Sequence, residues 1–585
     1  MIRPTETDLT HVFAEFSRGR FDSRSPLSIL GGGEPGGKAR GLADVRGALE
    51  AGLHADRPAG IAVDIPALAV LGTDVFDAFL KDNHLAETAA SDISDDRLAS
   101  AFQKADLPFH VLGDLRALVN QVQAPLAIRS SSLLEDARAA PFAGVYNTKM
   151  IPNASYDADA RFRELTQAIK FVYASTFSRL AKDYRAATGY ADSDEKMAVI
   201  VQELVGKRYP GRHYPELSGV ARSYNYYPMA PARPEDGVVS LALGLGKTIV
   251  DGGRCWTYSP AASRVDPPFG SVEKLLKESQ TEFWAVNMGE PPEFDPIRET
   301  EYLVSESLSE AERDGTLRYL VSTYSPLSGR LSIGMPFPGP RALTFAPLLI
   351  LEDPPVNEVI GDVLKTCETA VGNPVEIEFA MTFEPHRFRF LQIRAMPGAL
   401  QETRLEAEEL EGERVLVSGG IALGNGVVDT LTDIVFTRPD AFDLKHTAAM
   451  ATELEGLNRG LVRAGRPYVL VVLGRLGTTD PWLGIPIRWA GISAARVVVE
   501  AAQEKARVEL SQGSHFFHNL MSLGVKYFNL PFSGPHRLDW DWLGRQPAYE
   551  ETRFFRHLRL PRPVLVKVDG RSSRGVILKP KDTPA

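Results

Sequence analysis

Polar motifs in the first two-thirds of the chain carry residue types suited to phosphate chemistry. The first is GGGEPGGKARGL, residues 31–42, in which glycines and Lys38 precede a helical pattern. Glycines let backbone N–H groups approach phosphate oxygens, a helix N-terminus favours anions, and a lysine adds a point charge. Residues 32–38 fit a phosphate-loop spacing, but Ala39 stands where Ser or Thr would hold magnesium. The alternative is a flexible loop that binds nothing.

A second polar motif, PLAIRSSSLLEDARAAPFAGVYNT, covers residues 125–148. Its apolar start predicts a strand that runs into Arg129, which is followed by serines at 130–132 and by the acidic pair Glu135 and Asp136. Arginine and hydroxyl donors can hold a polyphosphate through charge-assisted hydrogen bonds. The alternative is a polar loop that joins a strand to a helix.

A third motif, residues 375–398, predicts a hairpin with charged side chains on one face. Glu376 and Glu378 alternate along the first strand, and Gln392 and Arg394 alternate along the returning strand. Pairing of the two strands would bring Glu378, Gln392 and Arg394 together. Such a set can hold magnesium through oxygen ligands and neutralise a transferring phosphoryl group. The alternative is an amphipathic hairpin with a surface salt bridge.

Together these motifs resemble the N-terminal nucleotide-binding domain of the phosphoenolpyruvate synthase and pyruvate phosphate dikinase family, an ATP-grasp fold. Six elements follow the order of that family over about 360 residues. They are Gly36-Gly37-Lys38; Ile128-Arg129-Ser130-Ser131 with Glu135-Asp136 and Phe142-Ala143-Gly144; Val201-Gln202-Glu203-Leu204; Ser218-Gly219-Val220; Gly244-Leu245-Gly246-Lys247; and Glu376-Ile377-Glu378-Phe379 with Leu391-Gln392-Ile393-Arg394.

The resemblance implies a role for each matching residue. Magnesium would be bound by Glu378 and Gln392, and Arg394 would stabilise the moving phosphoryl group. Lys38 and Arg129 would contact the ATP phosphates, and residues 202–204 would lie beside adenine. The residues expected to contact ATP are Lys38, Arg129, Gln202, Glu203, Leu204, Gly244, Gly246 and Lys247.

Lys247 departs from the family pattern, which has Glu after Gly-Leu-Gly. A cation therefore replaces a carboxylate near the nucleotide, and it either adds a phosphate contact or points to solvent. The family's phosphohistidine signature, G-G-x-T-S-H-A-A, is also not found. About 170 residues follow the matched region, too few for a (β/α)8 barrel, so pyruvate is not supported as the final substrate.

His515, in the segment SQGSHFFHNL, is the candidate phosphoryl acceptor because a neutral imidazole can accept this group. A structural histidine beside Phe516 and Phe517 is the alternative. Residues 478–486 have the character of a ligand loop, in which Asp480 could act as a base and Trp482 could stack on a ligand. A capped turn over a core is the alternative.

The composition is that of a large globular protein. The 585 residues are 44% hydrophobic and 24% charged, which predicts several compact units. A net charge of −10 argues against a general nucleic-acid or membrane-surface binder. Two cysteines cannot form a disulfide framework, and neither an apolar leader nor a membrane-length segment is visible. We expect a cytoplasmic protein, with homo-oligomerisation left open.

Helical and strand patterns interleave, which predicts an α/β (α+β) fold. Residues 161–187 have helical spacing, and residues 198–204 read as an apolar strand. We expect a split ATP-grasp domain over residues 1–400, a charged helical linker at 401–414, and a smaller α/β module of uncertain role at 415–585. The module shows strand patterns at 467–473 and 495–499, and a strand, Asp-Gly turn and strand at 564–578.

The leading functional expectation is an ATP- and Mg²⁺-dependent phosphotransferase that acts on an unidentified acceptor. One alternative is an ATP-grasp ligase that works through an acyl phosphate. The other is a non-catalytic ATP-binding regulator or scaffold, which the missing carrier signature and Lys247 favour. All three share a nucleotide site. The resemblance therefore supports ATP binding better than it supports any one reaction, because fold alone does not determine the reaction.

Overall fold

The computed structural model describes residues 13–19, 27–52, 60–135, 145–188, 195–225, 232–251, 253–264, 272, 275–276, 279–396, 403–419, 421–477, 484–502, 525–531, 536–570 and 572–580. Helices and strands interleave along these ranges and build mixed sheets, so the expected α/β (α+β) class is confirmed. Within the same ranges, no helix combines the length and the apolar composition needed to cross a lipid bilayer.

The first sheet has both faces buried. In chain order its strands are β1 (Phe13–Glu15), β2 (Leu27–Leu30), β4 (Leu68–Leu71), β5 (Leu126–Ser132), β6 (Thr148–Ile151) and β7 (Met197–Glu203). They lie in the order β1-β2-β4-β7-β5-β6, with β1, β2 and β4 parallel and the other neighbours antiparallel. Side chains of a strand alternate between faces, so Val199 and Val201 join one core while Ala198 and Ile200 join another.

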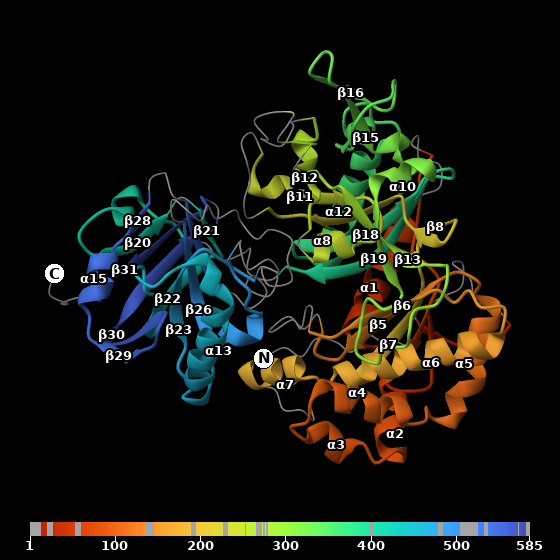
Figure 1. Cartoon of the computed structure of the whole chain (residues 1–585), viewed down its shortest axis with the longest axis horizontal. Coiled ribbons are helices and arrows are strands. Elements are labelled where there is room, and N and C mark those ends of the chain that lie inside the picture. The colour runs from red at the N-terminus through yellow and green to blue at the C-terminus, as the bar shows by residue number, and fades with distance from the viewer. Residues whose placement is uncertain are drawn as a thin grey trace.

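Helices cover one face of this sheet. They are α2 (Thr73–Asp82), α3 (Ala86–Ala90), α4 (Asp95–Lys104), α5 (Phe109–Gln121), α6 (Ala158–Ser175) and α7 (Arg179–Thr188). Figure 1 shows α2 to α6 below the sheet, with further sheets above it. The helix expected over residues 161–187 is two helices, because Ser178 Oγ accepts the N–H of Ala181 at 3.3 Å and begins a new one.

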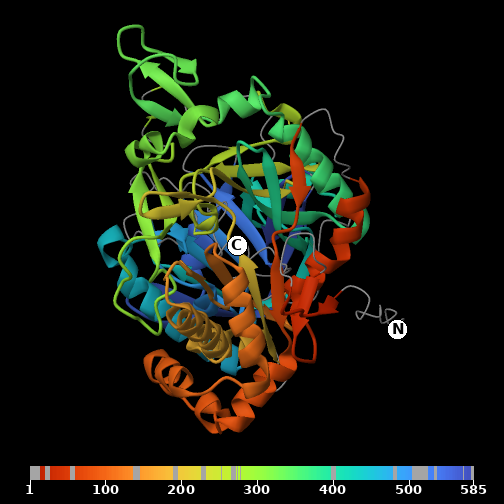
Figure 2. The ribbon, with the colours of Figure 1, turned by 90° about the vertical axis from the view of Figure 1, so that its right-hand side faces the viewer.

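A second sheet lies above the first, with smaller ones beside it. Its order is β12 (Trp256–Tyr258), β11 (Val238–Ala242), β10 (Leu217–Arg222), β18 (Val375–Thr382), β19 (Arg387–Ala395) and β3 (Ala62–Asp64). The smaller sheets contain β8 (Lys207–Tyr209), β9 (Arg212–Tyr214), β13 (Glu282–Asn287) and β14 (Leu303–Ser307), and β15 (Val321–Ser325), β16 (Arg330–Ile333) and β17 (Arg341–Leu343). Figure 2 shows the β15–β16 hairpin projecting at the end of the molecule farthest from α2 and α3.

Helix α1 packs between the two main sheets. The helices of this region are α1 (Gly36–Gly52), α8 (Lys247–Val250), α10 (Leu308–Arg313), α11 (Ala346–Leu349) and α12 (Val356–Val371), with 3-10 turns at Pro234–Asp236, Pro260–Ala262 and Thr316–Tyr319. A Cβ atom on Gly36 would lie 1.6 Å from the carbonyl oxygen of Ser131, and one on Gly37 would lie 1.7 Å from that of Glu135. The glycine pair therefore permits a close approach of α1 to the end of β5.

The C-terminal region builds a separate ten-stranded sheet. Its strands are β20 (Val415–Gly419), β21 (Ile421–Leu423), β22 (Gly426–Thr437), β23 (Tyr468–Leu473), β26 (Ala495–Ala501), β27 (Lys526–Leu530), β28 (Arg537–Leu538), β29 (Ala548–Glu551), β30 (Phe555–Asp569) and β31 (Arg574–Leu578). The core order β22-β23-β26-β27 is parallel, and β30 and β31 form the expected antiparallel hairpin. The remaining elements are α13 (Thr447–Arg463), α15 (Trp540–Arg545), the short pair β24 (Arg475–Leu476) and β25 (Gly484–Ile485), and 3-10 turns at Leu444–His446 and Trp489–Ile492.

The expected helical linker contains a single short turn in its described part. Among residues 403–414, only Ala407–Leu410 is helical, as a 3-10 turn. Leu405 and Leu410 pack against β20 and β31, and Glu409 forms an ion pair with Lys567. These contacts outweigh the helix propensity of the glutamates. No sheet in the described ranges joins strands from both sides of this segment, and the domain boundaries stay predictions.

Candidate functional site

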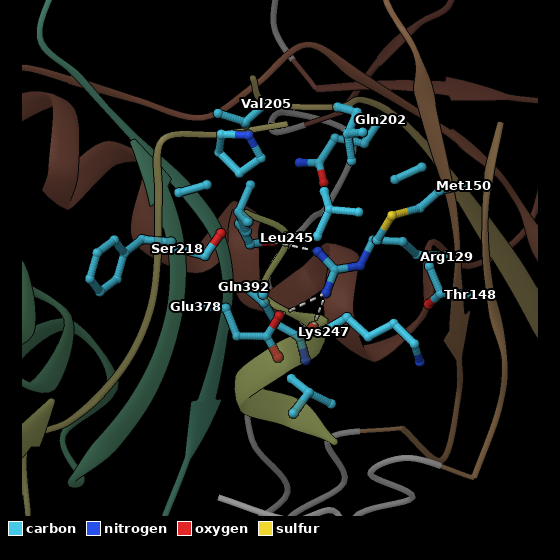
Figure 3. A pocket seen from close by; sticks show the side chains of 18 of the residues that line it. Arg129, Thr148, Met150, Gln202, Val205, Ser218, Leu245, Lys247, Glu378 and Gln392 are labelled. Carbon is cyan, nitrogen blue, oxygen red and sulfur yellow. Dashed lines mark hydrogen bonds and ion pairs between the residues drawn. The ribbon is translucent and has the colours of Figure 1, made fainter. Parts of the chain in front are cut away.

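A cavity of about 270 Å³ lies between the two main sheets (Figure 3). One wall comes from β5, β6 and the end of β7, and the other from β10, β18 and β19. The lining includes Lys38, Ala127, Arg129, Tyr146, Thr148, Met150, Gln202, Glu203, Leu204, Ser218, Gly246, Lys247, Asp251, Glu299, Glu378, Gln392 and Arg394. Segments more than 350 residues apart in sequence therefore meet at one cavity.

The hairpin of β18 and β19 brings its polar residues together as expected. Glu378 is the cross-strand partner of Gln392, and Glu376 is the partner of Arg394. A register shift after Glu378 interrupts the regular pairing at this point. The Arg394 guanidinium lies 3.6 Å from Glu376 and 4.0 Å from Glu378, measured between nitrogen and carboxylate oxygen.

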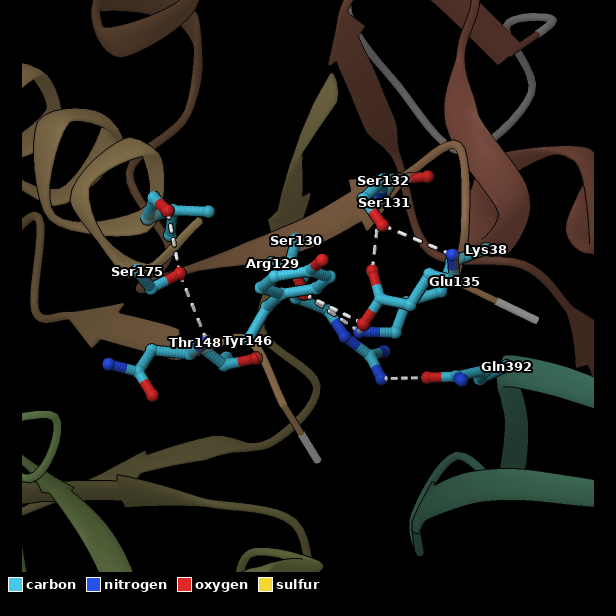
Figure 4. Close-up of polar contacts among 12 residues, drawn as sticks. Lys38, Arg129, Ser130, Ser131, Ser132, Glu135, Tyr146, Thr148, Ser175 and Gln392 are labelled. Atoms are coloured by element: carbon cyan, nitrogen blue, oxygen red, sulfur yellow. Dashed lines mark hydrogen bonds and ion pairs between the residues drawn. The ribbon is translucent and has the colours of Figure 1, made fainter. Parts of the chain in front are cut away.

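Arg129 reaches from β5 across the cavity to this hairpin. Its Nη2 donates to Glu378 Oε2 at 3.1 Å and to Gln392 Oε1 at 2.5 Å, and its Nη1 donates to the Leu391 carbonyl at 3.3 Å (Figures 3 and 4). Burial alone would raise the pKa of Glu378, but Arg129 and Arg394 outweigh it and hold that pKa below its usual value. Glu378 is therefore an ionised carboxylate at neutral pH.

Lys38, at the start of α1, forms an ion pair with the buried carboxylate of Glu135. Its Nζ lies 2.6 Å from Glu135 Oε1 and donates to Ser130 Oγ at 3.0 Å (Figure 4). Ser130 Oγ and the Ser132 N–H also donate to the Glu135 carboxylate. The two charged side chains are 8% and 0% exposed. The glycines at 31–37, expected to cradle phosphate, lie outside the cavity lining, and Gly36 and Gly37 serve close packing instead.

The end of β7 forms the apolar and amide-lined part of the cavity. The N–H groups of Glu203 and Leu204 are bonded to the carbonyls of Ala67 and Pro125, which fixes this segment across the sheet. Gln202 is 2% exposed, and its Nε2 has no hydrogen-bond partner among the described residues. Figure 3 shows its side chain directed into the cavity. A buried donor without a partner favours a ligand acceptor at this position.

The turn before α8 places Lys247 on the cavity wall. Gly244 has φ +81°, and a Cβ there would lie 2.7 Å from the Trp284 carbonyl, so this turn requires glycine. Gly246 and Lys247 line the cavity, whereas Gly244 does not. The Lys247 side chain is 17% exposed and forms an ion pair with Asp251 at 2.8 Å, so it does not point freely into solvent.

Several lining residues escaped the sequence reasoning about the site. Tyr146 and Thr148 belong to the second motif, whose pattern predicts no role for them, and Met150 and Glu299 lie outside every motif. The alternation of Thr148 and Met150 on a strand beside Arg129 was the available signal for β6. His515, Asp480 and Trp482 lie outside the described residues.

Comparison with known proteins identifies the first two-thirds of the chain. The family of the pyruvate phosphate dikinase AMP/ATP-binding domain matches residues 34–414. An uncharacterized phosphotransferase, YvkC, from Bacillus subtilis (strain 168) is 25% identical over 358 residues, which are 59% of this chain and 33% of the relative. The match thus spans about a third of the length of that relative. Because the family covers more than half of the residues and its ordered motifs surround one cavity, the chain belongs to the pyruvate phosphate dikinase AMP/ATP-binding domain family.

Proposed function

We propose that this protein is an ATP- and Mg²⁺-dependent phosphotransferase whose two main sheets clamp the nucleotide in an ATP-grasp arrangement. The observation that carries the proposal is the meeting of Lys38, Arg129 and Arg394 with Glu378 and Gln392 at one cavity. Three cations and two oxygen donors are the groups that phosphoryl transfer needs, because its catalysis is mostly positioning and charge stabilisation.

The cavity has an end for the base and an end for the phosphates. Ala127 and Met150 are cross-strand partners and provide apolar surface near Gln202, whose unpaired amide donor suits a ring nitrogen of adenine. Two residues further along β5, Arg129 marks the charged end, which continues to Lys38. The triphosphate would lie along these cations, where charge-assisted hydrogen bonds are strong.

The Glu378 and Gln392 pair fits a magnesium ion. The carboxylate is ionised, and an amide oxygen faces the same space, so both donors are of the type that Mg²⁺ prefers. No group of three His, Cys, Asp or Glu side chains forms a metal cluster in the described part of the chain. Two protein ligands suit an ion that takes its other ligands from phosphate and water. Glu378 and Gln392 would hold the ion, whose positive charge would offset the negative charge of the phosphates.

Arg129 has to change partners when metal and nucleotide bind. In the structure its guanidinium is bonded to the oxygens of Glu378 and Gln392 that face the cavity. The phosphates offer it alternative acceptors, and its departure makes both oxygens available. Arg394, which lies on the hairpin near Glu376, then stabilises charge that develops on the transferred group.

The acceptor is either His515 or a small molecule that binds near the junction with the C-terminal region. An imidazole acceptor corresponds to the dikinase cycle, and direct transfer corresponds to a simple kinase. The phosphotransferase name of the Bacillus relative supports phosphoryl transfer in general and leaves this choice open.

Labelled ATP distinguishes these routes. The full chain is incubated with Mg²⁺ and ATP labelled at the β and γ phosphates, and nucleotide products and acid-labile protein label are followed. AMP with label on His515 supports the dikinase route, and loss of that label in His515→Asn confirms the residue. ADP without protein label supports direct transfer. Unchanged ATP in the presence of cell-extract metabolites would contradict catalysis.

A further inference from the structure

A loop from the upper sheets crosses to the first sheet and closes one side of the cavity. This loop, residues 288–302, joins β13 to β14 and passes beside β6, lime green in Figure 1. Lys149, on β6, forms an ion pair with Glu301 at 2.5 Å and donates to the carbonyls of Asp295 and Arg298. The two paired side chains are 4% and 2% exposed. The buried ion pair and the two hydrogen bonds from Lys149 together attach the loop to β6.

The fixed loop places a carboxylate, Glu299, on the cavity wall. Its Oε1 accepts the backbone N–H of Thr148 at 3.1 Å, which orients the carboxylate. Thr148 is the cross-strand partner of Arg129, and Met150 is the partner of Ala127. Glu299 is therefore attached one register step beyond the apolar pair of Met150 and Ala127, level with Arg129, where the charged end of the cavity begins.

Glu299 brings a carboxylate to the cavity in which Lys247 stands at the position of the family's glutamate. Burial raises the pKa of Glu299, and the positive charge of Lys247, which lines the same cavity, partly opposes that rise. Asp251 is engaged by Lys247 at 2.8 Å. On this side of the cavity, the turn before α8 contributes the cation Lys247, and Glu299 contributes an oriented carboxylate.

A carboxylate at this place selects for hydroxyl groups. An ionised carboxylate only accepts hydrogen bonds, and it repels phosphate oxygens. The part of a nucleotide between base and phosphates is the sugar, whose 2′ and 3′ hydroxyls are neutral donors. A hydrogen bond from a hydroxyl to a charged acceptor is stronger than one between neutral groups.

We propose that Glu299 binds the sugar hydroxyls of the nucleotide and makes the site selective for ribonucleotides over deoxyribonucleotides. This inference rests on the proposed function, because it assumes that the cavity holds a nucleotide. Glu299 would be a specificity-determining residue that lies outside the three polar motifs of the sequence.

The test compares affinities for ATP, 2′-deoxy-ATP and 3′-deoxy-ATP, measured by calorimetry with Mg²⁺ on the full chain. Wild-type protein should bind ATP at least about tenfold more tightly than one of the deoxy analogues. Glu299→Gln, of nearly the same shape, should reduce this ratio to about twofold or less while it binds that analogue as the wild type does. Glu293→Gln removes the same charge from an exposed position of the same loop and should leave the ratio unchanged.

Three results would overturn the inference. The wild type could bind ATP and both deoxy analogues equally. Glu299→Gln could retain the wild-type ratio. It could also lose affinity for all three nucleotides in the same proportion, which would show that Glu299 only holds Thr148 or the loop. A wild-type chain that binds none of them refutes the proposed function as well, so the two failures are distinguishable.

Discussion

The buried pair of Lys38 and Glu135 offers a quantitative test of the architecture at the charged end of the cavity. Its nitrogen-to-oxygen distance is 2.6 Å, and neither side chain is more than 8% exposed. Removing one member leaves the other charge buried, which costs about 3–5 kcal/mol. Ser130 continues to contact the survivor. We therefore expect about 3 kcal/mol of lost stability for Lys38→Met or for Glu135→Gln.

A double-mutant cycle isolates the pair. The double variant removes both charges, so its loss should be smaller than the sum of the single losses by about 1.5–3 kcal/mol. The assay is urea unfolding of the full chain at neutral pH, followed by circular dichroism. Arg46 and Glu50 form a matched control on the same helix, with side chains 21% and 65% exposed. Their coupling should stay below about 0.5 kcal/mol.

Additive losses for Lys38 and Glu135, within about 0.5 kcal/mol, would refute the reasoning. They would show that the two charges do not sense one another. Equal coupling in the control pair on α1 would be just as damaging, because it would remove the role of burial.

Further predictions concern the metal, the chemistry and pH. In the absence of nucleotide, Arg129→Met should raise the affinity of the protein for Mn²⁺ about tenfold, because Glu378 and Gln392 lose a competing cation. Electron paramagnetic resonance titration measures this affinity, and an unchanged value would contradict the prediction. Arg394→Met should slow label transfer at least about a hundredfold while ATP affinity changes less than about fivefold; parallel losses would contradict a role in the transition state. Burial raises the pKa of Glu500 from 4.5 to about 7, so the folded state binds the proton more tightly and stability falls as pH rises from 4.5 to about 7. In the wild type, the free energy of unfolding should therefore fall by on the order of 1–3 kcal/mol between pH 5 and 8, and in Glu500→Gln this decrease should be absent. Urea unfolding across this pH range measures the difference, and an identical pH profile in both proteins would refute the prediction.

Local patterns in the chain predict the parts of the site that depend on short-range structure. Alternation of Glu376 and Glu378 against Gln392 and Arg394 is enough to predict a hairpin that brings Glu378, Gln392 and Arg394 together, and β18 and β19 form it. The register shift after Glu378 was not foreseen, because a bulge leaves no regular mark in the alternation of side chains.

Contacts between distant segments are beyond such patterns. Arg129 meets Glu378 across 249 residues, so only the packing of the two sheets shows that the predicted phosphate ligand is bonded to the predicted metal ligands. Glu299 lies in an irregular loop without periodicity, and its importance follows from the Lys149–Glu301 pair that anchors the loop. Gly36 and Gly37 resembled a phosphate cradle because close packing and anion binding call for the same residue type.

Binding of ATP to the cavity is the claim on which the others depend. Calorimetry of the purified full chain with ATP and excess Mg²⁺ tests it, with Arg129→Met as the comparison. The account predicts saturable one-to-one binding below millimolar concentration, weakened at least about tenfold in the variant because a phosphate contact is lost. An absence of saturable binding at millimolar ATP, or equal affinity in both proteins, would contradict it.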